Sequence, residues 1–137
     1  LQDRGLALTT LRCAAPLDTA AFDIPLQMQS ASEGMRTQKI NAFGDDPKVW
    51  AQASPVNHVA AGKGMPSFLF VVRNVQSTIA QQQAFKDKLD AAGVSHSTIS
   101  APTLSHDEVN TLIGAPRDTI MTPPLMAFLQ RCFADRE

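Results

Sequence analysis

The stretch SFLFVV, residues 67–72, decides the fold of this chain. From Phe68 to Val72 it is uninterruptedly apolar, and a run of this length is typical of a strand rather than a helix. A strand that is apolar on both faces is expected in a parallel sheet with helices on either side. The residues therefore predict a buried strand at the centre of an α/β domain.

The residues that follow extend this strand into a βαβ unit. The segment TIAQQQAFKDKLDAAG, residues 78–93, has helical periodicity, with capping-box spacing between Thr78 and Gln81 and with Gly93 as its stop. Residues 94–99 are more polar and rich in β-branched side chains, which indicates a strand near the edge of the sheet. Strands that alternate with helices predict the α/β class.

A further helix is predicted near the end of the chain, with Thr122 as its N-cap and Pro123 at its first position. Its apolar residues recur at helical spacing and are expected to pack on the sheet: Leu125, Phe128, Leu129, Cys132 and Phe133. Cys13 and Cys132 are interpreted as buried core thiols. A disulfide or a metal site is less favoured, because no second Cys or His lies at ligand spacing.

Upstream of residue 66 the sequence predicts one strand and a helical region. The segment RCAAPLDTAAFDIP, residues 12–25, indicates a short strand over 13–17 at the edge of the sheet, since Pro16 removes a ladder donor. Residues 26–55 are interpreted as a helical, lid-like insertion. One helix is expected to start at Ser30 with Glu33 as its capping-box partner, and another after Asp46. We therefore predict a single domain, 1–137, with a strand-helix-strand-loop-helix unit over 66–137.

Composition narrows the functional class. The 137 residues are 44% hydrophobic and 18% charged, with a net charge of -1, which argues against disorder and against a broad nucleic-acid surface. No apolar run approaches the roughly 20 residues that cross a bilayer. We expect a soluble chain, cytoplasmic by default, although its start at Leu1 leaves an upstream export signal open.

The best candidate for chemistry is His106, in the segment SHDE at residues 105–108. Reactive residues of parallel sheets gather in loops at the carboxyl ends of the strands, and residues 101–114 form such a loop in the predicted order. A histidine there is placed to act as a general base. From spacing alone, a solvent-exposed loop histidine near two acids is the favoured alternative.

Several segments together resemble the C-terminal half of esterases and lipases of the α/β-hydrolase superfamily. They are LDTAAFDIP, WAQASPVNHV, the strand and helix quoted above, and SHDEVNTLIGAPRDTIMTPPLMAFL, in register over roughly residues 11–133. In that family a serine on a G-x-S-x-G elbow, an acid and a histidine follow in this order. The resemblance implies that His106 is the general base and that the elbow and the oxyanion loop lie before residue 1.

The resemblance also marks a departure at the acid. The family places Asp or Glu after the strand that corresponds to residues 68–72, but this loop reads RNVQS over 73–77. Gln76, or less favourably Asn74, stands at the acid position, and an amide cannot hold an imidazolium as a carboxylate does. No G-x-S-x-G occurs in the chain, Ser105 adjoins the histidine too closely to serve it, and a buried Cys13 is expected to be inert.

We therefore expect a partial carboxylic-ester hydrolase that is inactive as this chain alone. The alternatives are a non-catalytic module, descended from such an enzyme, for small-ligand binding or assembly, and an unrelated small α/β binding domain. No cofactor and no metal are predicted. Expected partners are a second copy of the chain, forming a homodimer, or a complementary N-terminal hydrolase fragment, with a small ester or acyl compound as ligand.

Other polar and apolar candidates are given structural roles. His58 is interpreted as a hydrogen-bonded structural residue and His96 as a strand residue on an exposed face. Solvated or capping roles are assigned to Asp18, Asp23, Asp45 and Asp46. Core packing is favoured over an acyl pocket for Met28, Met35 and Trp50.

Overall fold

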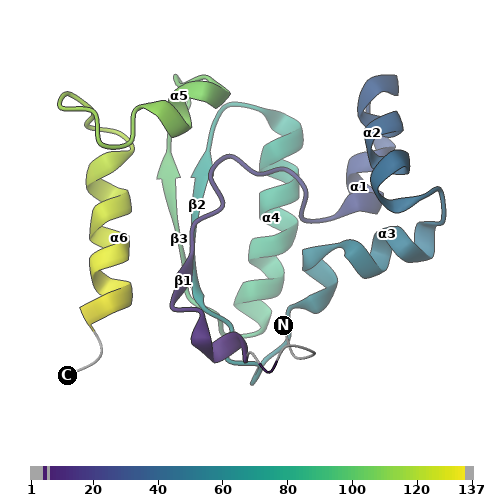
Figure 1. Cartoon of the computed structure of the whole chain (residues 1–137), viewed down its shortest axis with the longest axis horizontal. Helices are drawn as coiled ribbons and strands as arrows, with labels where there is room; N and C mark the ends of the chain where they lie inside the picture. Colours follow the sequence, from purple (N-terminus) through teal and green to yellow (C-terminus); the bar gives the residue numbers. More distant parts are fainter. Residues whose placement is uncertain (1–4, 6, 135–137) are drawn as a thin grey trace.

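A three-stranded parallel sheet forms the centre of the computed structural model, which describes residues 5 and 7–134 (Figure 1). The strands are β1 (Cys13–Ala14), β2 (Ser67–Val72) and β3 (His96–Ser100), in the order β1-β2-β3. Each outer strand runs parallel to β2, with Cys13 opposite Ser67 and Phe68 opposite His96. The fold class predicted from the sequence is confirmed, with the apolar run as the central strand.

Helices cover the two faces of this sheet, which explains why β2 is apolar throughout. Helix α6 (Thr122–Ala134) lies on one side and α4 (Gln76–Ala91) on the other (Figure 1). The buried core toward α6 contains Leu69, Val71, Ile99, Ala101, Val109, Met121, Leu125 and Phe128. The buried core toward α4 contains Phe22, Val56, Phe70, Phe85 and Leu89. Alternate side chains of β2 thus enter alternate cores.

Three helices occupy the region interpreted as lid-like. They are α1 (Ile24–Gln29), α2 (Glu33–Phe43) and α3 (Pro47–Ala53), and they lie on the α4 side of the molecule, away from α6 (Figure 1). Helices α1 and α2 both contact α3, and α1 also contacts α4. Helix α2 buries no residue. Its function as a lid stays a prediction. The short 3₁₀ turns η2 (Leu8–Thr10) and η3 (Pro55–His58) complete the N-terminal half.

The capping predictions were right at Asp46 and wrong at three other helices, α2, α4 and α6. The Asp46 carboxylate accepts from the Lys48 amide and starts α3 as expected. Helix α2 is capped by Ser32 rather than Ser30. Helix α4 begins at Gln76, without a side-chain cap at Val75.

The Thr78/Gln81 capping box fails because Gln81 has a tertiary partner. Its Oε1 accepts from the Asp23 amide at 2.7 Å, and its Nε2 donates to the Asp23 carbonyl at 2.8 Å. Thr78 and Gln81 both lie within α4, not before its start, and both are buried. The amide side chain therefore ties α4 to the start of α1, which sequence spacing could not indicate.

The start of α6 is held by Asp118, not by Thr122. The Asp118 carboxylate accepts from the Ile120 and Met121 amides at 2.9 and 3.0 Å and from the Thr122 hydroxyl at 2.6 Å. The hydrogen bond from Thr122, helped by these amides, lowers the pKa of Asp118 from 3.8 to about 2. One carboxylate therefore orders the turn that leads into the closing helix.

Replacing Asp118 with asparagine is expected to lower the thermal unfolding midpoint at neutral pH. Because folding lowers the pKa of Asp118, its ionised carboxylate stabilises the folded chain above pH 3.8. This stabilisation is lost as the pH falls toward 2. Thermal unfolding followed by circular dichroism at neutral pH and near pH 2 checks this, with Asp45→Asn, an exposed acid, as control. If the unfolding midpoints of Asp118→Asn and of the unmodified chain differed equally at both pH values, the role of the charge would be contradicted.

Two expectations for the ends of the chain need correction. Phe133 was expected to pack on the sheet, but it is 63% exposed. Cys13 and Cys132 are half-buried rather than buried, and both pack against the same α6-side core.

In the part of the chain that the structure describes, no helix has the length and apolar character needed to span a bilayer.

Candidate functional site

Three charged or titratable side chains meet at the carboxyl ends of the strands. Asp18 follows β1, Arg73 follows β2 directly, and His106 follows β3 as the first residue of α5 (His106–Thr111). Each strand of the sheet thus contributes one residue. This is the edge at which parallel sheets place their reactive groups.

One oxygen of Asp18 joins the three residues. Asp18 Oδ2 lies 2.7 Å from His106 Nδ1 and 2.6 Å from Arg73 Nε. Arg73 Nη1 also donates to the Leu104 carbonyl at 3.4 Å. A carboxylate can only accept, so the hydrogen of this ion pair lies on His106 Nδ1. The carboxylate therefore binds a guanidinium and an imidazole through the same atom.

The site is buried at the carboxylate and open at the imidazole. The Asp18 side chain is 1% exposed and that of Arg73 is 18% exposed, whereas the His106 side chain is 64% exposed. Charged side chains are rarely buried unless they are paired, and Arg73 supplies the compensating charge. The buried pair therefore fixes an imidazole that remains accessible to another molecule.

Asp18 also has an unusual backbone conformation. Its φ is 53°, the only positive φ of a residue other than glycine in the described part of the chain. Aspartate tolerates this left-handed region better than most residues, and such conformations cluster at functional sites. The turn directs the side chain inward beneath His106. A solvated or capping role for Asp18 is therefore wrong.

His106 lies on a helix rather than on the expected loop. Ser105 caps α5 by accepting from the Glu108 amide at 3.2 Å, and Glu108 Oε2 accepts from the Ser105 amide at 2.7 Å. The backbone hydrogen bond from Ser105 lowers the pKa of Glu108. This reciprocal capping box holds the turn that carries His106, and it commits Ser105 to the backbone instead of to nucleophilic chemistry.

In the described part of the chain, the two residues predicted at the acid position make no hydrogen bond with His106. Asn74 and Gln76 are exposed on the loop after β2 and at the start of α4. Among the described residues, the hydrogen-bond partner of His106 Nδ1 is Asp18, one strand earlier in the chain. That Asn74 and Gln76 stand where the family has its acid stays a prediction. The ion pair is made by Asp18, a residue for which the sequence suggested only a solvated or capping role.

The other candidates have structural partners. His58 Nε2 lies 2.5 Å from the Gln52 carbonyl, in keeping with a hydrogen-bonded structural residue. His96 lies on the more exposed face of β3, together with Thr98 and Ser100, as expected, and its Nε2 is 3.0 Å from Asp90 Oδ1. Asp23 caps α1 by accepting from the Leu26 amide.

A hollow of about 500 Å³ lies close to this site, between α1, α2 and the first turns of α4. It is lined by Ala20, Leu26, Gln27, Gln29, Ser30, Ser32, Met35, Val75, Ser77, Thr78, Ala80 and Gln81. Ala20 follows Asp18 by two positions, and Val75 follows Arg73 by two positions. Met35, expected in the core, is 39% exposed and lines this hollow, whereas Met28 is buried.

The arrangement has the geometry of the base end of a catalytic triad. With Nδ1 hydrogen-bonded to a carboxylate, Nε2 carries the lone pair of the neutral ring and can take a proton from a nucleophile. Among the described residues, no group of three His, Cys, Asp or Glu side chains is placed to hold a metal ion. The side chains themselves support acid–base chemistry.

Comparisons with known proteins identify the fold. No family model matches the sequence, and no curated protein matches it significantly. Among solved structures, the crystal structure of EstE5-PMSF is similar to this chain, with a TM-score of 0.60 and 16% sequence identity. The likeness covers 96% of this chain and 43% of that one, so the chain spans less than half the length of its structural relative. This chain has the fold of part of an α/β-hydrolase.

Proposed function

We propose that this chain is the base-supplying part of a carboxylic-ester hydrolase, with His106 as general base and Asp18 as the acid that orients it. The hydrogen bond of 2.7 Å between Asp18 Oδ2 and His106 Nδ1 carries the proposal. Asp18 takes the place of an acid in the loop after β2, where the amides of Asn74 and Gln76 cannot carry a negative charge. The likeness to EstE5 supports the reaction class.

The nucleophile in this proposal comes from a segment outside the chain. The chain holds no G-x-S-x-G, and its fold corresponds to 43% of the EstE5 chain. The external serine would approach His106 Nε2, and the hollow beside α1 and α2 would receive one side of the ester. We accordingly propose that the isolated chain does not turn over esters.

Ester hydrolysis and serine labelling together test this proposal. The chain alone is expected to release no p-nitrophenol from p-nitrophenyl butyrate above the level of its His106→Ala variant. It is also expected to take up no fluorophosphonate label. Once the chain is joined to a segment with a G-x-S-x-G elbow, hydrolysis is expected, with the label on that elbow.

In the joined protein, His106→Ala is expected to lower kcat by roughly 10⁴-fold or more, because the serine then has no base. His96→Ala is the matched control, since this histidine lies at the start of β3, at the opposite ends of the strands from His106. Equal losses in the two variants would sink the assignment of His106. Turnover by the chain alone that disappears in His106→Ala would contradict the need for an external serine.

An assembly function is the second candidate, favoured by the edge of the sheet at β1. Among the described residues, strand β1 pairs with β2 on one side only, and beside it lies a largely apolar hollow of about 490 Å³. The lining residues are Leu8, Ala14, Ala15, Pro16, Phe22, Pro55, His58, Met65, Phe68 and Phe85. An open strand edge next to apolar surface is a template for association.

We propose that this edge is covered by a complementary hydrolase segment or, without one, by a second copy of the chain. Size-exclusion chromatography with light scattering is expected to give a dimer at micromolar concentration. Ala14→Lys is expected to shift the chain to monomer, because it puts a charge at the open edge. Ala80→Lys, on the exposed face of α4, is the control. A stable monomer of the unmodified chain would contradict self-association.

A further inference from the structure

The two cysteines are 119 positions apart in the chain but lie side by side in the fold. Cys13 is on β1 and Cys132 is on α6, and both pack against the core between α6 and the sheet. The thiols are free, and Cys132 lines the same pocket as Arg12 and Ser67, which are the chain neighbour and the strand partner of Cys13. Two free thiols that lie close together meet the first condition for a disulfide.

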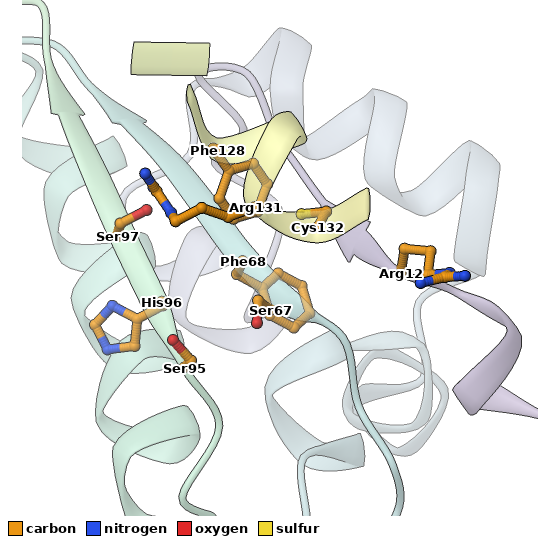
Figure 2. A pocket seen from close by; sticks show the side chains of 9 residues that line it. All are labelled: Arg12, Ser67, Phe68, Ser95, His96, Ser97, Phe128, Arg131 and Cys132. Atoms are coloured by element: carbon orange, nitrogen blue, oxygen red, sulfur yellow. The ribbon is translucent and has the colours of Figure 1, made fainter. Parts of the chain in front are cut away.

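Cys132 also opens onto a pocket that the proposed hydrolase does not use. The pocket measures about 400 Å³ and lies at the amino-terminal ends of the strands, opposite the edge that carries His106 (Figure 2). It is lined by Cys132 together with Arg12, Arg131, His96 and three serines, Ser67, Ser95 and Ser97. In Figure 2, Arg131 extends from α6 toward Ser97, and the sulfur of Cys132 lies between Arg131 and Arg12 in this view.

We propose that Cys13 and Cys132 form a reversible redox site that closes to a disulfide when an anionic low-molecular-weight disulfide, such as glutathione disulfide, enters this pocket. The two guanidinium groups suit the carboxylates of such an oxidant, and the serines add hydrogen-bond donors. The site does not rest on the proposed hydrolase function, because neither Asp18 nor His106 takes part.

The order of the exchange follows from the surroundings of the two thiols. Burial, and then the neighbouring Cys132 thiol, raise the pKa of Cys13 to about 11, so Cys13 is protonated at neutral pH. Cys132, which lines the pocket, therefore attacks the glutathione disulfide first and releases one glutathione thiolate. Cys13 then loses its proton, attacks Cys132 Sγ and releases the second glutathione. Two thiols are oxidised to one disulfide, and glutathione disulfide is reduced to two thiols.

The disulfide would join the edge strand to the closing helix. Such a link closes a loop of more than 100 residues, and long loops restrict the unfolded chain most. The oxidised chain is therefore expected to unfold at a temperature roughly 5–15 °C above the reduced chain. The site thus couples the redox state of the surroundings to the attachment of α6.

Incubation with glutathione and glutathione disulfide at graded ratios tests the proposal, with intact mass and thiol titration after denaturation as readouts. We expect a monomer that has lost two hydrogen atoms, holds no glutathione and has no titratable thiol, and whose thiols return with dithiothreitol. Cys13→Ser is expected to trap glutathione on Cys132, and Cys132→Ser to leave Cys13 largely unmodified.

The unmodified chain alone can overturn the proposal, whatever the folding of the serine variants. Thiols that stay free at every ratio, glutathione retained on both cysteines, or a disulfide between two chains would each contradict a paired site. An unchanged unfolding temperature after oxidation would contradict the coupling to α6. Arg131→Gln is expected to slow the exchange several-fold with glutathione disulfide but not with uncharged hydroxyethyl disulfide, and equal slowing would rule out a role for charge in the pocket.

Discussion

Replacing Asp18 with asparagine is expected to lower kcat of the serine-containing hydrolase by roughly 10⁴-fold. The new amide can donate a hydrogen bond to His106 Nδ1, which stabilises the tautomer with its hydrogen on Nε2 and leaves no lone pair for the serine. The imidazolium formed during the reaction also loses its counter-charge. Initial rates of p-nitrophenyl butyrate hydrolysis at saturating substrate measure the loss.

Asp107→Asn is the matched control for this change. Asp107 directly follows His106, but it is exposed at the first turn of α5, and its carboxylate makes no hydrogen bond with another described residue. Its kcat is expected to stay within about two-fold of the unmodified value. If Asp107→Asn abolished turnover while Asp18→Asn kept it, the acid would belong to α5 and not to the loop after β1. Near-UV circular dichroism of each variant is the check that it is folded.

Replacing Arg73 with methionine is expected to destabilise the chain by about 3 kcal/mol. The substitution leaves the Asp18 carboxylate 1% exposed without its guanidinium, and burial of an unpaired charge is costly. Urea unfolding of the chain at neutral pH gives the free energy. Arg117→Met, an exposed arginine, is the control and is expected to change stability by less than about 0.5 kcal/mol.

A double-mutant cycle separates this electrostatic effect from lost packing. When Asp18→Asn is added to Arg73→Met, the buried charge is gone, and the double variant is expected to be more stable than Arg73→Met alone. The coupling is expected to be about 1–3 kcal/mol. Strictly additive losses would show that Arg73 contributes only its methylene packing.

Much of the fold follows from local sequence pattern. The apolar run of β2, the helix ended by Gly93 and the amphipathic α6 all have periodicities that predict their type and order. The expected arrangement of parallel strands is confirmed by the sheet order. Errors lie at element ends, as at Thr78 and Thr122, where a tertiary contact or a neighbouring carboxylate replaces the predicted cap.

The ion pair of Asp18 was harder to predict because its partners are 55 and 88 positions away in sequence. One signal was present. Asp18 directly follows the apolar segment AAPL, so the rule that places His106 at a carboxyl strand end places Asp18 there too. The family pattern drew attention to the loop after β2 instead. Burial, which distinguishes Asp18 from Asp45 and Asp46, cannot be inferred from a short loop.

The tautomer of His106 tests the central claim most directly, and the isolated chain suffices. Nitrogen-15 NMR of the neutral imidazole distinguishes a protonated ring nitrogen from one with a lone pair. We predict the hydrogen on Nδ1, facing Asp18, and the lone pair on Nε2, with the opposite preference in Asp18→Asn. A hydrogen on Nε2 in the unmodified chain, or the same tautomer in both proteins, would contradict Asp18 as the residue that orients the base.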